Sequence, residues 1–463
     1  MLLYFLVDSS SVSDDPTTLE IGGRRWWLTS EEVDASQQHP KDFICISYTW
    51  GTKRAPNPFD ASKSVSSNTI PGLYAAIHQR PDCHRFWIDA FCVPSDPDQK
   101  RFTLASMGFI YSQAQEVIVV LSETSTLALE QMLISDTIDE AALEALESEP
   151  WITRAWTYQE VVNSYTLSFT CASPVPLPGA SYNLVTAISG DTFLNRIGYT
   201  LSKLPMRSFE KAQAYPSLSA FEDLIVDWMT AAYQERSALQ VMANMDRRVQ
   251  ERAEDHFYAM IGPMTADLAS LSPEGNACEE FMALCERKGD YSFIYSLAAR
   301  SEERTKTWRP SSEGDLPAIL PWHCWGEKQP GHWEDGALYL DEMVVLKPGQ
   351  LGDEGEKFIR GWLTAATEFG SEDIPVEDSM FYCLEQMGFK SHCRTVDSSA
   401  GYLFLCEDLS PDDNVTLLVS ASLRWTFGAP GMARWETNGE TKYTAGIFVG
   451  LIKQNETSTV KMI

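Results

Sequence analysis

Short apolar runs alternate with helical patterns through the first half of the chain. Runs rich in β-branched or aromatic residues predict four buried strands, at Phe43–Tyr48, Arg85–Asp89, Val117–Leu121 and Tyr165–Cys171. A helical pattern from Thr69 separates the first two runs, and another from Asp98 separates the next two. This alternation predicts βαβ units, which form a parallel sheet with helices on both faces. The first half is therefore predicted to be an α/β domain.

A third helix is predicted from Trp151 to Asn163, since Pro150 suits the first position of a helix. One face of this helix carries Ile152, Trp156 and Glu160, which follow one another at intervals of one turn. A carboxylate aligned with an indole and an isoleucine is expected to be partly desolvated. Two interpretations of Glu160 stay open on this pattern: an ion pair with an arginine, or a role in chemistry.

The pattern changes beyond about Asp290. Alternating or β-rich runs predominate there, with Gly, Pro, Asn and Asp between them: ALYLDEMVVL, KFIRGWLTA, GYLFLC, NVTLLVSASLRWTF and YTAGIFVGLI. They predict a second, mainly antiparallel β region with little helix. At 463 residues the chain is long enough for two cores. We therefore expect residues 1–265 to form the α/β domain with a helical extension, and residues 266–463 to form a β-rich domain.

The formal net charge of −29 at pH 7, without a stripe of Lys and Arg, argues against nucleic acid or an anionic membrane as a partner. No apolar run reaches the ~18 residues of a membrane-spanning helix, and the opening MLLYFLV is interpreted as a strand. The ten cysteines form no CxxC pair, which is typical of free thiols in a reducing compartment. The sequence thus predicts a cytoplasmic protein.

Common catalytic and cofactor motifs are missing: the sequence has no GxGxxG after a strand, no GxxxxGK[ST], no HExxH and no GxSxG. His323, Cys324 and His332 crowd together, but their spacing is looser than that of paired zinc ligands. The tryptophans around them are interpreted as packing between domains, with a recognition surface as the alternative. No resident cofactor or metal is predicted.

Ligands of open α/β sheets bind where the carboxyl ends of neighbouring strands diverge. Tyr48 and Trp50 end the first predicted strand, so their rings either stack on a flat ligand or belong to the core. Asp89 ends the second strand, where a carboxylate either binds a ligand or caps the adjoining loop. Arg154, on the third helix, is equally suited to an ion pair and to a phosphate. Each candidate thus has a structural alternative.

Four blocks, in this order, resemble the heterokaryon-incompatibility (HET) domain of filamentous fungi: ICISYTWG, FWIDAFCVPSDPDQKRFTLASMGFIYSQAQEVIVVLSE, PWITRAWTYQE and AEDHFYAMIG. The resemblance spans roughly Lys41 to Met264. The chain departs from the family's pattern at Pro94 and Ser95, where the family has Asn-Gln, and at Ser122, where it has glycine. These departures affect any ligand contact that the loop after the second strand would make.

HET domains are similar to TIR domains, so the resemblance implies a flavodoxin/TIR-like parallel sheet with flanking helices. ICISY resembles the first TIR strand, and Trp156 and Glu160 resemble the tryptophan and glutamate of the TIR WCxxE helix. In enzymatic TIR domains that glutamate carries NAD cleavage. The resemblance therefore implies that Glu160 is the catalytic residue of an NAD nucleosidase, with NAD as substrate rather than as cofactor.

The chemistry of this implied reaction needs few groups. Nicotinamide leaves as a neutral ring, so no general acid is required, and one carboxylate near the ribose can stabilise the oxocarbenium-like charge. On this interpretation Tyr48 and Trp50 flank a ring, and Asp89 holds a ribose hydroxyl. Arg154 and Trp156 complete the substrate-binding set.

Different classes of function stay open. The first is an executioner enzyme of fungal non-self recognition, a form of innate immunity, which consumes NAD in programmed cell death as a homo-oligomer and responds to a protein trigger. The second is a non-enzymatic module that signals by self-assembly, with Glu160 in a structural role. A HET-like fold recruited to another small-molecule reaction is a third. Release of nicotinamide distinguishes the first from the others.

Overall fold

The structure, a computed structural model, describes residues 2–8, 18–33, 42–172, 187–206, 208–230, 236–267, 276–367, 374–390, 394–407, 409, 414–453 and 456–463. The chain forms two compact units. Unit 1 comprises Met1–Pro205, Tyr215–Met229 and Ile261–Leu271, and unit 2 comprises Met206–Ala214, Thr230–Met260 and Ser272–Ile463. Residue 265, the predicted boundary, lies in the last segment of unit 1. Within the described ranges, no helix has the length and apolar character needed to cross a membrane.

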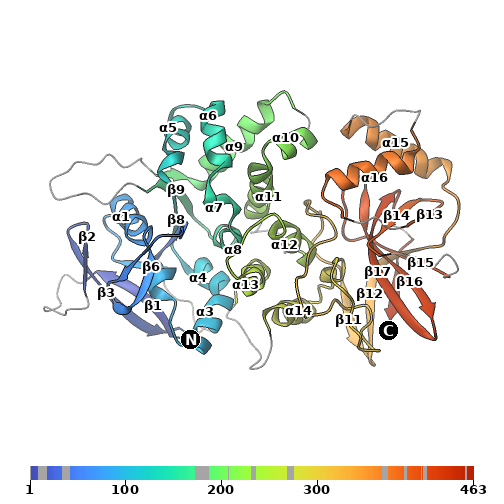
Figure 1. Ribbon diagram of the computed structural model, residues 1–463, viewed down its shortest axis with the longest axis horizontal. Helices are drawn as coiled ribbons and strands as arrows, with labels where there is room; N and C mark the ends of the chain where they lie inside the picture. The colour runs from blue at the N-terminus through green and yellow to red at the C-terminus, as the bar shows by residue number, and fades with distance from the viewer. Residues whose placement is uncertain are drawn as a thin grey trace. The chain divides into compact units, whose positions relative to one another are not determined.

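Unit 1 is built on an eight-stranded sheet with the order β10-β9-β8-β4-β7-β1-β3-β2 (Figure 1). In chain order the strands are β1 Leu2–Asp8, β2 Leu19–Ile21, β3 Arg24–Glu32, β4 Ile44–Tyr48, β7 Arg85–Ile88, β8 Glu116–Leu121, β9 Leu167–Cys171 and β10 Ile188–Ser189. The four strands predicted from apolar runs are confirmed as β4, β7, β8 and β9. A separate hairpin, β5 Arg54–Asn57 with β6 Asp60–Ser66, follows β4.

The sheet is mixed: the four predicted strands are parallel to one another, and antiparallel strands that were not predicted to pair with them extend the sheet at both edges. Strands β7, β4, β8 and β9 run parallel, whereas β10 and β1 add to the two edges of this set in antiparallel orientation. The opening apolar segment forms strand β1, as predicted, and β3 and β2 extend the sheet beyond it. Gly22 and Gly23 join β2 to β3 with φ angles of 61° and 71°, which suit a two-residue hairpin loop.

Helices cover both faces of this sheet. In chain order they are α1 Thr69–Gln79, α2 Asp89–Cys92, α3 Pro97–Ala105, α4 Met107–Gln113, α5 Thr126–Ile134, α6 Glu140–Glu147, α7 Pro150–Thr153, α8 Ala155–Val162, α9 Gly190–Lys203 and α11 Pro216–Thr230. Figure 1 shows α1 on one side of β8 and α4 and α8 on the other. Neighbouring residues of β4 face these two layers, because the ring of Tyr48 lies against Gly72 of α1 while Ser47 contacts Glu160 of α8.

The predicted helix from Trp151 to Asn163 is interrupted, so its expected continuous faces are wrong. Arg154 is extended, with φ −76° and ψ 143°, and separates α7 from α8. Its guanidinium donates a hydrogen bond of 2.7 Å to the carbonyl oxygen of Tyr48, at the end of β4. This contact fixes the joint to the sheet, and the side chains before and after Arg154 do not share one helical wheel.

Helix α4 packs closely against the segment around Gly262, and a glycine makes this approach possible. A Cβ atom on Gly108 would lie 2.7 Å from the Cα and the carbonyl oxygen of Gly262, which are backbone atoms that cannot move aside. We expect Gly108→Ala to lower the free energy of unfolding of unit 1 by about 1–3 kcal/mol, measured by urea unfolding.

The matched control for this glycine is Gly198, inside α9, where a Cβ would meet no atom within 4 Å. Gly198→Ala should leave the free energy of unfolding unchanged or raise it by roughly 0.5–1 kcal/mol, because alanine restricts the unfolded chain. Equal losses of stability in the two variants would contradict the close approach at Gly108.

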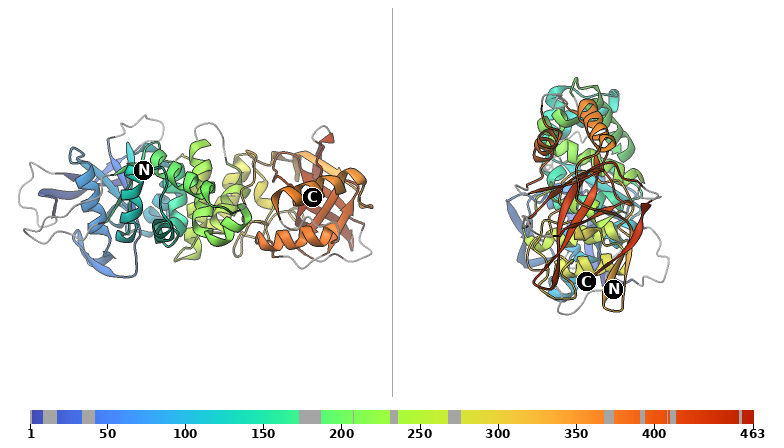
Figure 2. Two further views of the ribbon diagram at one scale, coloured as in Figure 1. Left: turned by 90° about the horizontal axis from the view of Figure 1, so that it is seen from above. Right: turned by 90° about the vertical axis from the view of Figure 1, so that its right-hand side faces the viewer.

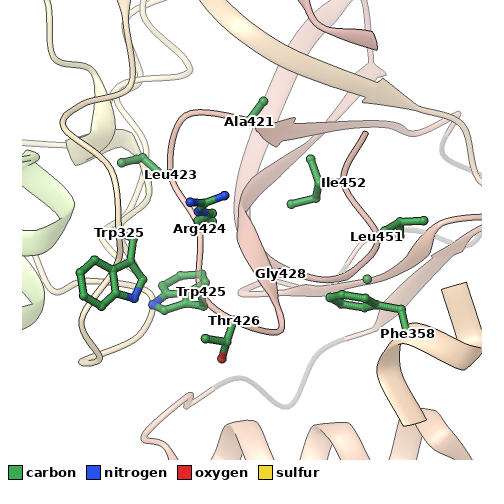
Figure 3. Close-up of a pocket in the computed structure, with 11 residues that line it drawn as sticks. Trp325, Phe358, Ala421, Leu423, Arg424, Trp425, Thr426, Gly428, Leu451 and Ile452 are labelled. Atoms are coloured by element: carbon green, nitrogen blue, oxygen red, sulfur yellow. The ribbon is translucent and has the colours of Figure 1, made fainter. Parts of the chain in front are cut away.

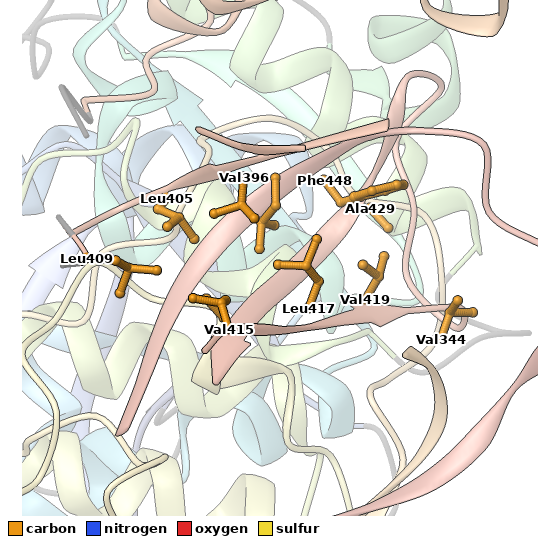
Figure 4. Close-up of a cluster of buried hydrophobic side chains, with 11 residues drawn as sticks. Val344, Val396, Leu405, Leu409, Val415, Leu417, Val419, Ala429 and Phe448 are labelled. Atoms are coloured by element: carbon orange, nitrogen blue, oxygen red, sulfur yellow. The ribbon is translucent and has the colours of Figure 1, made fainter. Parts of the chain in front are cut away.

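Unit 2 contains a second eight-stranded sheet, in which β11-β12-β15-β16-β17-β14-β13 are neighbours and β18 pairs with β12. In chain order the strands are β11 Gly331–Glu334, β12 Ala337–Leu346, β13 Thr395–Ser398, β14 Gly401–Leu405, β15 Thr416–Ser420, β16 Gly428–Thr437, β17 Glu440–Gly450 and β18 Ser458–Met462. The described pairings are antiparallel, which confirms the β-rich C-terminal region. Figure 4 shows apolar residues of one core cluster of this sheet, among them Leu417, Val419 and Phe448.

The expectation of little helix in the C-terminal region is wrong at one of the five runs. KFIRGWLTA lies in α15 Asp353–Ala366, which packs beside α16 Val376–Gln386 and against β14 and β17 (Figures 1 and 2). Gly355, Ile359 and Leu363 are the buried positions of α15, and their spacing of four residues defines a helical face. Four further helices lie between β10 and β11 in the sequence, in addition to α9 and α11. They are α10 Ser208–Ala214, α12 Ala238–Met245, α13 Ala253–Met264 and α14 Ala277–Arg287.

Candidate functional site

Glu160 lies near the carboxyl end of β4, on helix α8. Its side chain is buried, with 6% of the residue exposed. The hydroxyl of Ser47 donates a hydrogen bond to Oε2, and the hydroxyl of Tyr111, from α4, donates one of 3.2 Å to Oε1. Two hydroxyl groups from different elements therefore hold the two carboxyl oxygens.

Ser47 connects the carboxyl of Glu160 to α7, the helix that precedes Arg154. The indole Nε1 of Trp151, on α7, donates a hydrogen bond of 2.7 Å to the Ser47 oxygen. Ser47 thus accepts from an indole and donates to Glu160, which fixes the direction of its hydroxyl. The ring of Tyr111 packs edge-on against Trp87 of β7, with 5.7 Å between centroids, so the second donor is also held in place.

Burial raises the pKa of Glu160 to about 7, although the hydrogen bond from Ser47 and the positive charge of Arg154 act in the opposite direction. Arg154 also lowers the pKa of Asp89, but burial outweighs it and the pKa of that carboxyl is raised. Both acids lie in low-dielectric surroundings, where the charged form is disfavoured. At neutral pH Glu160 can therefore hold or release a proton.

Asp89 and Trp50 meet at the same edge of the sheet. The indole Nε1 of Trp50 donates a hydrogen bond of 2.7 Å to Oδ2 of Asp89, whose Oδ1 accepts one of 2.7 Å from the backbone N–H of Ala90. Asp89 is the first residue of α2, and its carboxylate binds the next N–H, whereas the N-cap position, Ile88, makes no side-chain cap hydrogen bond. The guanidinium of Arg54 lies over the Trp50 ring, 5.3 Å from its centroid, and covers part of its surface.

The remaining predicted residues take different positions. Tyr48 is buried on the α1 face of the sheet, where its hydroxyl lies 2.8 Å from Oγ1 of Thr69. Trp156, one turn before Glu160 on α8, is half-buried. The structure therefore connects Glu160 and Arg154 to the end of β4, and Asp89 to Trp50, and the hydroxyl of Tyr48, on the α1 face, also interacts with Asp89.

Three residues that contact this acid or its donor are absent from the predicted set: Ser47, Tyr111 and Trp151. Strand alternation is the signal for Ser47, because in a βαβ unit successive residues of a buried strand face opposite helical layers. Tyr111 and Trp151 come from helices whose rotation about their axes is set by tertiary packing, so sequence spacing alone does not place them.

Within the described ranges, no three or more His, Cys, Asp or Glu residues are grouped so that they could hold a metal ion. The ring of His323 lies against Trp325, and that of His332 stacks on Tyr339. The thiol of Cys324 is buried near the carbonyl oxygen of Arg424. The side chains of His323, Cys324 and His332 therefore each pack against a different partner.

A family comparison identifies the region that forms this edge. Residues 43–137 match the model of the family described as heterokaryon incompatibility protein (HET). The chain carries a HET domain. The matched part of the HET domain includes Ser47 and Asp89, while Arg154 and Glu160 follow it, and the domain implies a role in heterokaryon incompatibility. No curated protein and no solved structure gave a match.

The raised pKa of Glu160 makes the stability of unit 1 depend on pH. The ordinary pKa of the carboxyl is 4.5 and its folded value is about 7, so in between the unfolded chain ionises while the folded one stays protonated. The stability contributed by this group is complete below pH 4.5 and is lost as the pH rises through about 7. We expect the free energy of unfolding of the wild type, relative to Glu160→Gln, to fall by about 2–3 kcal/mol between pH 5 and pH 8.

Urea unfolding of both proteins across this pH range measures the difference. Subtraction removes the titration of groups that the two proteins share, such as Asp246 in unit 2, whose pKa burial raises to about 7. A difference that stays constant from pH 5 to pH 8 would mean that Glu160 does not change its protonation state on folding.

Proposed function

We propose that the HET domain and the α7–α8 segment after it form an NAD nucleosidase, which hydrolyses the nicotinamide–ribose bond in fungal non-self recognition and programmed cell death. The observation that carries the proposal is the position of Glu160: a buried carboxyl with a raised pKa, held by Ser47 at the carboxyl end of β4. Enzymes tune carboxyl pKa values to near neutral pH at sites of this kind.

The order of the parallel strands supports a flavodoxin- and TIR-like arrangement. Numbered along the chain, β4, β7, β8 and β9 take the order 2-1-3-4 across the sheet, as the flavodoxin order begins. The switch point of that order lies between its first and third strands, here β4 and β8, and ligands bind outside their carboxyl ends. Ser47 and Tyr48 are the last residues of β4, so Glu160 is held beside the switch point.

Polar groups near this edge suit a nucleotide with ribose and phosphate groups. Arg154 supplies a positive charge that acts on both Glu160 and Asp89. The hydroxyl of Thr49, directly after β4, is buried and has no hydrogen-bond partner in the described part of the chain, so a ligand could provide one. In the proposed complex Asp89 binds a ribose hydroxyl and the ring of Trp50 packs against a base.

The reaction breaks the bond between ribose C1′ and the nicotinamide nitrogen. The bonding electron pair stays with nicotinamide, which leaves as a neutral ring, and the oxygen of water adds to C1′ while a proton is released. Ionised Glu160 stabilises the positive charge that develops on the ribose. Because the carboxyl has a pKa of about 7, the rate should rise with pH up to about that value.

Incubation of the purified full chain with NAD, with free nicotinamide followed by chromatography, tests the proposal. Nicotinamide should accumulate in proportion to the protein concentration and faster at pH 8 than at pH 6. Failure to detect it at either pH, at protein concentrations that also allow homo-oligomers to form, would exclude the enzyme.

A second candidate is a non-enzymatic HET module that signals by self-assembly after contact with a protein trigger. One observation favours it: Glu160 is only 6% exposed, and both of its oxygens already have protein partners. In that case the carboxyl stabilises the contact between α8 and β4. Light scattering distinguishes the two, because assembly that proceeds without nicotinamide release supports the module.

A further inference from the structure

A cavity of about 490 Å³ opens in unit 2 beside the loop from β15 to β16. This volume lies within the range of small-molecule sites, ~300–1,000 Å³. The larger apolar side chains in its walls are Trp325, Trp425, Phe358, Leu423, Leu451 and Ile452. Figure 3 shows the two tryptophans on one side of the opening, with Phe358 across from them. Ring surfaces therefore face the cavity from both sides.

Arg424 is the one charged residue among those described as lining this cavity. Its side chain is exposed, and its guanidinium pairs with no carboxylate of the described residues. The contrast with a hollow of unit 1 is clear, because Arg85 there pairs with both Glu31 and Asp42. Arg424 thus lies beside three aromatic rings, and no acidic residue is among those described as lining the cavity. Such surroundings are unusual in a chain with a net charge of −29.

The loop that carries Arg424 is fixed by its neighbours. Arg424 and Trp325 exchange two backbone hydrogen bonds of 2.9 Å, and the ring of Trp425 stacks on Phe427 with 5.6 Å between centroids. Gly428 closes the loop where a Cβ would lie 1.8 Å from the carbonyl oxygen of Phe448, so only glycine fits. The wall of the cavity is thus preorganised, which lowers the entropic cost of binding a ligand.

We propose that this cavity binds a small aromatic carboxylate, with the ring between the aromatic walls and the carboxylate on Arg424. A guanidinium presents two parallel N–H donors, which match the two oxygens of a carboxylate. A phosphate dianion needs more donors than one arginine supplies. The hydroxyl of Thr426 already accepts a hydrogen bond of 3.0 Å from Trp362 Nε1. The site stands on unit 2 alone and is independent of the function proposed for the HET domain.

Isothermal titration of the full chain with 1-naphthylacetate tests this site. Its neutral amide, 1-naphthylacetamide, and 1-naphthyl phosphate serve as comparison probes of the same ring size. The carboxylate should bind with a Kd below about 1 mM, as expected for a ligand of this size, and at least about 10-fold more tightly than the amide. Equal affinity for acid and amide, tighter binding of the phosphate, or no binding of any probe would each overturn the proposal.

Variants locate the site on the molecule. Arg424→Gln should weaken binding of the carboxylate about 10-fold and leave binding of the amide unchanged, whereas Trp325→Ala should weaken both, because it removes ring contact. Both side chains are exposed, with Trp325 at 50%, so the fold is expected to survive, and circular dichroism checks it. Arg304→Gln is the matched control, since that side chain is 88% exposed and does not line the cavity. An unchanged carboxylate affinity in Arg424→Gln would overturn the proposal.

Discussion

Glu160→Gln is expected to reduce the rate of nicotinamide release at least about 100-fold while the protein stays folded. Glutamine keeps the shape of the side chain and can still accept a hydrogen bond from Ser47, but it cannot become negatively charged. The developing charge on the ribose would then lose its stabilising partner. Single-turnover measurements at pH 8, where the wild-type carboxyl is mostly ionised, give the largest contrast.

The same measurement needs a control that removes a buried carboxylate elsewhere in the sheet. Glu116 begins β8, at the opposite end from the proposed site, and accepts hydrogen bonds of 2.6 Å and 2.7 Å from Arg80 and one from Ser168. Glu116→Gln should lower stability by about 1–3 kcal/mol and leave the rate per folded molecule within about twofold of the wild type. If both variants lose activity equally, or neither does, Glu160 has no catalytic role.

Asp290→Ala is expected to lower the free energy of unfolding of unit 2 by about 3–5 kcal/mol, the largest effect on stability among these variants. The carboxylate is buried and accepts backbone N–H groups from three separate places: Ala238 at the start of α12 (2.6 Å), Ser292 (2.9 Å) and Gln329 (3.1 Å). Alanine leaves all three donors without a partner in a dry interior. Urea unfolding monitored by tryptophan fluorescence measures the loss.

Two further variants test whether the loss of the acceptor oxygens of Asp290 causes this destabilisation. Asp290→Asn keeps one acceptor oxygen but turns an N–H₂ group towards a donor, so it should cost less than alanine and more than about 1 kcal/mol. Asp335→Asn, at an exposed turn with φ 48°, should stay within about 0.5 kcal/mol of the wild type, because asparagine tolerates that conformation. A loss below about 1 kcal/mol in Asp290→Ala would show that these donors find other partners.

The strands of the parallel set could be predicted because they are buried on both faces. All residues of β4, β8 and β9 are buried, so β4 and β8 read as mainly apolar runs, whereas β9 alternates apolar residues with Ser168 and Thr170. The antiparallel strands at the edges were harder to place, since their pairing depends on the Gly22–Gly23 turn and on contacts with β7. The sequence of α15 predicts a strand because Phe358 and Trp362 lie between its buried positions and obscure the helical period.

Only part of the candidate site could be predicted from the sequence. The carboxyl-edge rule placed Asp89 close enough to Trp50 for a hydrogen bond of 2.7 Å, because both follow adjacent parallel strands. The same rule assigns Tyr48 to this edge: the pleat of β4 directs its ring towards α1, and its hydroxyl interacts with Asp89. The desolvation of Glu160 was expected from an uninterrupted helix, yet its donors come from β4 and α4.

The joint at Arg154 affects how equivalent residues should be sought in other chains. Trp151 and Glu160 reach the same serine from two short helices, and the angle between these helices is set by a guanidinium anchored on a strand carbonyl. A search pattern that treats the whole stretch as one uniform helix would place the indole and the acid on the wrong relative faces. The geometry instead demands a fixed number of residues from the arginine to the indole on one side and to the acid on the other.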